Sequence, residues 1–181
     1  GVEVVDLAAG TDATPPVSTV LVTRATGERA VVSVNGTGTP DLRSAATAAL
    51  ADRSGTGGAL AGATAVLVDG HHLGAAVPLA AAARAAGIPV ALDGGSWKPG
   101  LGDLLEHVDH AVLSADFRLP SASGAPVDVR PGDRDPSGTH APAKAAVDDL
   151  LAAVAARWPV RSVARSAGGG PLRFVARGGA V

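Results

Sequence analysis

The chain has 181 residues, a formal net charge of −2 and 46% hydrophobic residues. This composition is typical of one globular domain with an aliphatic core and excludes a disordered chain. The near-neutral charge argues against a nucleic-acid partner, which would need clustered Lys and Arg. The absence of cysteine excludes disulfides and a thiol nucleophile. No apolar run reaches the roughly 18 residues of a membrane span, and the first residues do not read as a secretory leader. We therefore expect a cytoplasmic protein with no membrane partner, whose two ends lie inside a longer fold.

The first part of the chain, residues 1–38, predicts a β-hairpin. Two β-rich runs flank the polar sequence RATGER, in which Gly27 is a typical turn residue. The two runs are Thr19–Thr23 and Ala30–Val34. An alanine-rich sequence follows and predicts a packed helix, with Thr39 or Asp41 as its N-cap.

The remainder, residues 39–181, predicts strands and helices in alternation. Apolar runs predict parallel strands at Ala63–Gly70, 88–93 and 110–116, and helical patterns occur at Leu73–Gly87, 101–108 and Ala143–Trp158. The first of these strands is apolar on both faces, which predicts burial on both sides of the sheet. Pro78 is expected in the first turn of its helix. The final sequence, VRSVARSAGGGPLRFVARGG, predicts strand, turn and strand. The pattern predicts an α/β fold, with a mainly parallel, Rossmann-like sheet flanked by helices.

Polar residues follow three successive predicted strands, at the point where each strand ends. The sequences are DGHH at 69–72, DGGS at 93–96 and SAD at 114–116. Because parallel strands end at the same edge of a sheet, Asp69, Asp93 and Ser114 should lie along one rim, where ligands of such sheets bind. Lys98, just beyond the second strand, is placed to meet a phosphate or a carboxylate.

The stretch VLVDGHH…AAAARAAGIPVALDGGSWKPGLGDLLEHVDHAVLSADF resembles the middle of the ribokinase-like (PfkB-type) carbohydrate kinases. In that family a strand–helix–strand unit is followed by an Asp-Gly-Gly or similar loop, then by Pro-Gly, Leu-Leu, Val-Asp and a strand that ends in Ser or Asn. The upstream sequence GVEVVDL…STVLVTRATGERAVV is similar to the family segment with Gly-Val-Asp and Gly-Glu-Arg-Thr. Near the end, Ser166-Ala167-Gly168 stands in the place of the family's Thr-x-Gly turn.

The resemblance covers nearly the whole chain and implies a partial ribokinase-like domain, with residues 1–38 next to the lid and residues 39–181 as its α/β core. It implies a phosphotransferase that uses ATP and Mg²⁺ to phosphorylate a sugar hydroxyl. The implied substrate-binding residues are Asp69, His71, Asp93 and Lys98, and the implied nucleotide- or phosphate-binding residues are Ser114, Asp116, Ser166 and Gly168. The implied partners are the sugar and the nucleotide, with a homodimer through the lid as an option. No metal ligand or catalytic residue is assigned.

The sequence also departs from the family. The family's N-terminal sugar-binding strand and its Asp-Thr-x-Gly-Ala-Gly-Asp signature, which carries the catalytic base, have no counterpart, because GTGG at 55–58 and AGGG at 167–170 do not end in aspartate. At the third strand the usual Asn-x-x-Glu is replaced by Ser114–Phe117, which leaves Asp116 as the carboxylate. We therefore expect this stretch alone to be inactive, as an incomplete part of the enzyme. The alternative is a non-catalytic α/β module that binds a small ligand or a partner.

Several of these residues also have purely structural interpretations. The adjacent His71 and His72 cannot face one metal ion from a strand, so loop structure or a hydrogen bond to a sugar is favoured over a metal site. Asp93 fits a simple strand exit equally well, and Lys98 fits a solvated lysine. Packing or surface positions are expected for Trp97, Trp158, His107 and His110.

Overall fold

The computed structural model describes residues 1–12, 16–33, 40–52, 58–120, 144–167 and 170–177, with the side chains of the last helix described from residue 148 onward. The strands are β1 (Ser18–Val22), β2 (Arg29–Ser33), β3 (Val66–Val68), β4 (Val90–Gly94), β5 (His110–Leu113), β6 (Ser162–Arg165) and β7 (Arg173–Ala176). The helices are α1 (Arg43–Ala51), α2 (Leu73–Ala85), α3 (Leu101–Leu105) and α4 (Lys144–Arg157). This order of elements confirms the predicted α/β fold with an N-terminal hairpin.

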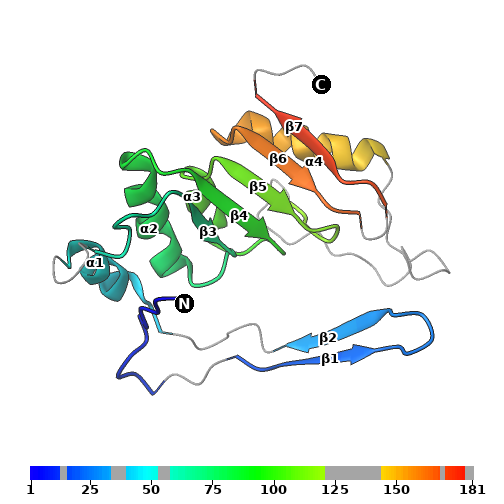
Figure 1. Ribbon diagram of the computed structural model, residues 1–181. Coiled ribbons are helices and arrows are strands. Elements are labelled where there is room, and N and C mark those ends of the chain that lie inside the picture. The colour runs from blue at the N-terminus through cyan, green and yellow to red at the C-terminus, as the bar shows by residue number, and fades with distance from the viewer. Residues whose placement is uncertain (13–15, 34–39, 53–57, 121–143, 168–169, 178–181) are drawn as a thin grey trace.

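The centre of the molecule is a five-stranded sheet with the order β3-β4-β5-β6-β7. Strands β3 to β6 are parallel, and β7 pairs antiparallel with β6. Each new parallel strand is added on the same side of the previous one. Connections of one handedness therefore bring their helices to the same face of the sheet. Figure 1 shows this arrangement, with α2, α3 and α4 behind the strands.

The hydrophobic core lies between these helices and one face of the sheet. Strand pairing puts Leu92, Ala111 and Val163 in one row across β4, β5 and β6, and each is no more than 1% exposed. The helices cover this row with buried side chains from α3 and α4, namely Leu101, Leu104, Leu105, Leu151 and Val154. Each fully buried aliphatic side chain of this size contributes about 1.5–3 kcal/mol, so this layer is the main source of stability.

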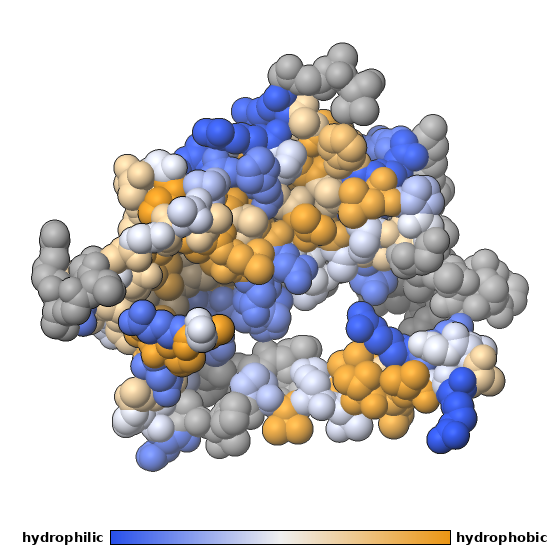
Figure 2. Space-filling view, in the orientation of Figure 1, coloured by the Kyte–Doolittle hydropathy of each residue, from blue (hydrophilic) through white to orange (hydrophobic). Residues whose placement is uncertain are grey.

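The opposite face of the sheet is open among the described residues. Leu67 of β3 is 74% exposed, Phe174 of β7 is 50% exposed and Val112 of β5 is 46% exposed. The prediction that the first strand is buried on both faces was therefore wrong. β3 is a short edge strand, and its alternate residue, Leu67, points away from the helices. Figure 2 looks onto this face and shows hydrophobic side chains gathered over the sheet and along the hairpin.

Two details of the helices differ from the prediction. Pro78 lies in the second turn of α2 and not in the first, because the helix begins at Leu73. Leu42, and not Thr39 or Asp41, occupies the N-cap position of α1, and it makes no side-chain capping bond. Asp41 still serves this helix end, since its Oδ1 accepts the N–H of Arg43 at 3.0 Å. Thr39 lies outside the described residues.

The predicted hairpin is present as β1 and β2, each starting one residue earlier than expected. Its turn is closed by bonds from the N–H of Thr23 to the carbonyl of Glu28 and from the N–H of Gly27 to the carbonyl of Thr23, both at 2.8 Å. Gly27 has φ of +73°, a value that favours glycine. Among the described helices and strands, β1 and β2 contact only each other, and Figure 1 shows the ribbon set apart from the sheet. In the described part of the chain, no helix combines the length and the apolar character needed to cross a bilayer.

A buried aspartate fixes the start of β4 against the start of β6. The carboxylate of Asp109 accepts the N–H of Val90 at 2.9 Å through Oδ2 and lies 3.1 Å from Nε of Arg161 through Oδ1. Its carbonyl accepts the N–H groups of Arg161 and Ser162 at 2.7 and 3.1 Å. The exposure of the two side chains is unequal, at 10% for Asp109 and 77% for Arg161. The ion pair itself is therefore screened by water, while the bond to Val90 is not.

We expect Asp109→Ala to lower the free energy of unfolding by about 1–3 kcal/mol, because it leaves the buried N–H of Val90 without an acceptor. The matched control, Arg161→Ala, removes only the exposed partner and should cost no more than about 1 kcal/mol. Urea unfolding followed by circular dichroism measures the free energy of unfolding of both variants. Equal losses in the two variants would show that the ion pair, and not the backbone bond, is the stabilising element.

Candidate functional site

The structure brings three of the predicted polar segments to one edge of the sheet. Asp69 directly follows β3, Asp93 is the fourth residue of β4 and Ser114 directly follows β5, and these three strands are parallel neighbours. A hydrogen bond of 2.6 Å from the Ser114 hydroxyl to the carbonyl of Gly95 ties the ends of β4 and β5 together. The predicted rim is therefore a continuous edge of the fold.

A cavity of about 550 Å³ opens at the β3 and β4 end of this rim. This volume is within the usual range for small-molecule sites. Its walls come from the turn after β3, the start of α2, the loop between β4 and α3, and the segments on either side of the hairpin. The lining residues are Pro16, Pro40, Asp41, Arg43, Gly70, His71, His72, Leu73, Gly74, Val77, Lys98, Pro99, Gly100 and Asp103.

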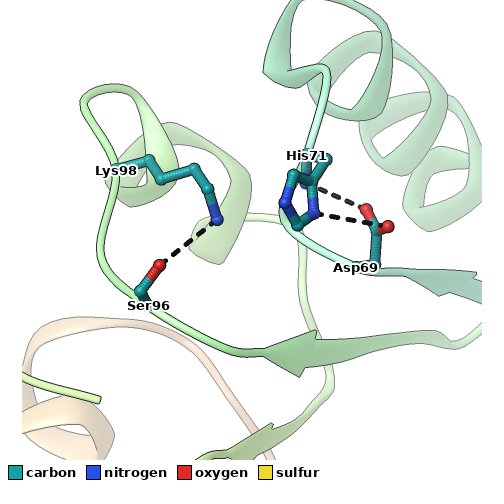
Figure 3. A network of polar contacts seen from close by, with 4 residues as sticks. All are labelled: Asp69, His71, Ser96 and Lys98. Carbon is teal, nitrogen blue, oxygen red and sulfur yellow. Dashed lines mark hydrogen bonds and ion pairs between the residues drawn. The ribbon is translucent and has the colours of Figure 1, made fainter. Parts of the chain in front are cut away.

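Two of the predicted substrate-binding residues line this cavity, namely His71 and Lys98. Figure 3 shows that Lys98 and His71 reach toward each other from the two loops. The carboxylate of Asp69 makes two contacts with His71. One carboxylate oxygen accepts the backbone N–H of His71 at 2.9 Å, and the other lies 3.4 Å from its Nδ1. The ammonium group of Lys98 has a hydroxyl neighbour, Oγ of Ser96, at 3.5 Å.

The turn after β3, which carries His71, has an unusual backbone conformation at two residues. Gly70 has φ of +71°, and His72 has φ of +46° and ψ of +51°. His72 is the one non-glycine residue with positive φ among the described residues. Such a conformation costs a residue with a Cβ roughly 1–2 kcal/mol, and residues that adopt it are enriched at functional sites. The turn allows α2 to begin at once after β3 and brings residues 70–74 to the cavity wall.

The second half of the rim, beyond β5 and β6, is built around two arginines. Arg165 at the end of β6 is only 2% exposed. Its guanidinium donates to the carbonyl oxygens of Ser114, at 3.3 Å, and Ala115. Arg118 donates to the carbonyls of Ala115 and Phe117, both at 2.9 Å. Burial lowers the pKa of Arg165 below its usual value, as does the nearby Arg118, and Asp116 opposes this effect.

The remaining predicted site residues are placed as follows. Asp93 is exposed, and the strand register puts it on the open face of the sheet in the row that contains Val112. Asp116 is exposed in the turn after β5, and Ser166 donates its backbone N–H to the carbonyl of Leu113 at 3.0 Å. Gly168 lies outside the described residues. The 550 Å³ cavity is lined by none of Asp69, Asp93, Ser114, Asp116 and Ser166.

Sequence reasoning missed three charged residues of the cavity, Asp41, Arg43 and Asp103. Asp41 and Arg43 belong to the start of α1, which packs against α2. The two helices meet closely at Gly74. A Cβ at that position would lie 2.2 Å from Oδ1 of Asp41. A Cβ at position 74 would therefore force the carboxylate of Asp41 to move. The local sequence around Asp41 indicates only a helix start, because the contact depends on a partner about thirty positions further along the chain.

Three aromatic residues pack together next to the loop after β4. Trp97 packs edge-on against Phe117 with ring centroids 6.4 Å apart, and its centroid lies 5.8 Å from that of Trp158. Nε1 of Trp158 donates to the carbonyl of Gly102 at 3.0 Å. Both tryptophans are thus packing residues, and Trp97 holds the loop that carries Lys98. Among the described residues no group of three or more histidines and acidic residues is arranged to hold a metal ion.

The fold is shared with solved structures. The chain is similar to a microbiome-derived acarbose kinase labelled with selenomethionine, with a TM-score of 0.55 and 20% identity, over 92% of this chain and 45% of that one. It is also similar to the protein Sa239, with a TM-score of 0.55 and 15% identity, over 93% of this chain and 48% of that one. The chain thus spans less than half the length of either structure, and a likeness at this identity shows the fold alone. No protein-family model and no curated protein matches the sequence.

We expect Gly74→Ala to destabilise the protein, because the added methyl group would displace the carboxylate of Asp41 from the N–H of Arg43. The matched control is Gly102→Ala in α3, where a Cβ would lie an ordinary 3.6 Å from Trp97. Replacing glycine by alanine in an uncrowded helix stabilises it by roughly 0.5–1 kcal/mol. The two variants should therefore change the free energy of unfolding in opposite directions. If both stabilise, the close approach of α1 and α2 does not constrain position 74.

The backbone conformation of His72 can be tested separately from its side chain. Asparagine tolerates the left-handed region, so His72→Asn should keep the free energy of unfolding within about 0.5 kcal/mol of the original protein. His72→Val should lose about 1–2 kcal/mol, because a β-branched residue is strained there. His71→Val is the control, since the neighbouring residue does not have positive φ. Equal losses for the two valine variants would contradict the assignment of strain to position 72.

Proposed function

We propose that this chain forms part of a ribokinase-like phosphotransferase that moves the γ-phosphoryl group of ATP to a hydroxyl group of a sugar. The observation that carries this proposal is the cavity at the carboxyl ends of β3 and β4, lined by His71 and Lys98. Ligands of open α/β sheets bind at this edge. The shared fold of a solved acarbose kinase and the resemblance of the residue 66–117 stretch to sugar kinases support the same assignment.

In this proposal the cavity holds the sugar. The imidazole of His71, oriented by Asp69, and the ammonium of Lys98 would hydrogen-bond its hydroxyl groups. None of the described lining residues is Phe, Tyr or Trp. A nucleoside substrate, whose base would need a stacking partner, is therefore disfavoured. Asp93, on the open face of the sheet, would bind the substrate at the border of this cavity.

The nucleotide would lie beyond β5 and β6, next to Ser114, Asp116, Ser166 and Gly168. A Mg²⁺ ion is commonly held by one or two carboxylates together with the phosphates of its nucleotide. The exposed Asp116 fits the role of a single protein ligand. When bound, the ion would offset phosphate charge during transfer. Arg165 holds the Ser114 and Ala115 carbonyls and therefore positions the turn that carries Asp116.

Phosphoryl transfer forms a bond between the sugar oxygen and the γ-phosphorus, breaks the bond to the bridging oxygen of ADP and releases the hydroxyl proton to a base. The family's base motif is not among these residues, so we propose that turnover belongs to a protein that contains this chain together with that motif. The chain itself would contribute the sugar cavity and one wall of the nucleotide site. Each charge-assisted hydrogen bond of this kind contributes roughly 1.5–3 kcal/mol.

The test is transfer of the γ-phosphoryl group from MgATP to a panel of sugars by the intact protein that contains these residues. We expect His71→Ala and Lys98→Met each to lower kcat/KM about tenfold or more, because each loses one polar contact to the bound sugar. His107→Gln is the matched control, since His107 does not line the cavity. Sugar binding without transfer would support the non-catalytic binding module instead. The absence of both binding and transfer with every sugar would contradict the proposal.

A further inference from the structure

The charged groups that line the cavity are not equivalent in their contacts. There are two carboxylates, Asp41 and Asp103, and two permanent cations, Arg43 and Lys98. Asp41 is occupied, since its Oδ1 accepts the N–H of Arg43 and lies against Gly74. Asp103 lies in the first turn of α3, where a negative charge stabilises the unpaired N–H groups of the helix. Both carboxylates therefore lie at the start of a helix, and Asp41 in addition accepts a backbone N–H there.

The two cations have no such partners. Among the described residues neither Arg43 nor Lys98 forms an ion pair. The one polar neighbour recorded for the ammonium group of Lys98 is the Ser96 hydroxyl, at the long distance of 3.5 Å. Lys98 is also partly buried, so its charge is less well screened by water than that of a surface lysine. The cavity thus presents two positive charges that form no ion pair with any described residue.

We propose that the substrate of this cavity carries an anionic group, a carboxylate or a phosphate, in addition to its hydroxyl groups. Arg43 and Lys98 would bind that group from the start of α1 and from the loop after β4. His71, held by Asp69, would bind a neighbouring hydroxyl. This inference rests on the proposed function and narrows its substrate from sugars in general to sugar acids or sugar phosphates.

The phosphates of the nucleotide are a less suitable partner for these two cations. The residues assigned to the nucleotide follow β5 and β6, and none of the described ones lines the cavity. That half of the rim has cations of its own, Arg118 and Arg165, whose guanidinium groups share the carbonyl of Ala115. The positive charge of Arg43 and Lys98 is therefore separate from the proposed nucleotide side. The start of α1, which supplies Arg43, has no contact with β5 or β6.

The test is direct binding of defined ligands to the intact protein that contains these residues, measured by isothermal titration calorimetry. The probes are D-gluconate as a sugar acid, D-glucose 6-phosphate as a sugar phosphate, neutral D-glucose, inorganic phosphate and ATP. We expect at least one of the two anionic sugars to bind at least tenfold more tightly than glucose and also more tightly than inorganic phosphate. Its affinity should fall as salt increases, because the attraction is electrostatic. The gluconate and glucose 6-phosphate arms distinguish the two sources of negative charge.

The variants Arg43→Gln and Lys98→Met should each weaken binding of the preferred anionic sugar about tenfold or more, with little effect on glucose. Arg84→Gln is the matched control, since it removes one positive charge at the far end of α2, outside the cavity. Circular dichroism and thermal unfolding verify that each variant is folded. A variant that does not fold is replaced by Arg43→Lys or Lys98→Arg, which keep the charge and should retain most of the affinity.

Four results would overturn the inference. An affinity for glucose equal to or greater than that for both anionic sugars would make the substrate neutral while leaving the proposed kinase function intact. A loss of ATP affinity in Lys98→Met, with unchanged affinity for sugars, would assign Lys98 to the nucleotide. Binding of inorganic phosphate as tightly as either anionic sugar would show an adventitious anion site. Failure of every sugar and of ATP to bind would contradict the proposed function as well.

Discussion

The parallel pairing of β3, β4, β5 and β6 is the constraint on which the rest of this structure depends. In a parallel sheet each strand must be followed by a crossover, and all strands end at the same edge. This geometry brings together the turns that carry Asp69, Gly95 and Ser114. The buried row of Leu92, Ala111 and Val163 holds the strands in register from the helical side. A one-residue slip of β4 would move its buried residues to the open face and Asp93 into the core.

The same sheet has an apolar face that nothing in the described residues covers. Leu67, Val112 and Phe174 are exposed there, although the strands of parallel sheets are usually buried on both faces. The hairpin has the same character, with Val20, Leu21, Val31 and Val32 all more than half exposed. An isolated two-stranded ribbon is at best marginally stable in water. Contiguous exposed apolar surfaces of this kind are uncommon on soluble monomers.

The order of the elements could be predicted from the sequence because each one has a local signal. Alternation or apolar runs mark the strands, and Gly27 and Gly87 mark the ends of a turn and a helix. The rim could be predicted because the strand ends are local as well. The open face could not, since an apolar residue such as Leu67 has the same pattern whether or not a second layer covers it. The contribution of Arg43 to the cavity could not be predicted either, because it depends on the contact between α1 and α2.

Arg165 is a charged residue at a strand position where the pattern of β6 predicts an apolar one. Its place two residues after Val163 puts it on the covered face of β6, where burial of a charge is costly. The cost is offset because the guanidinium replaces water with the carbonyl oxygens of the turn after β5. The same turn is also attached to the end of β4, because the Ser114 hydroxyl donates a hydrogen bond to the carbonyl of Gly95.

The two halves of the rim are therefore held at a fixed separation by short bonds between neighbouring strands. On one side are His71 and Lys98, and on the other are Asp116 and Arg165. Between them, the N–H of Ser114 donates to the carbonyl of Gly94 at 2.9 Å, and its hydroxyl donates to the carbonyl of Gly95. A transfer reaction needs its donor and acceptor held within a few tenths of an ångström of the reactive distance. For the proposed transfer this requirement would fall on the β4–β5 ladder and on the contact between Trp97 and Phe117, because both connect the loop of Lys98 to the turn of Asp116.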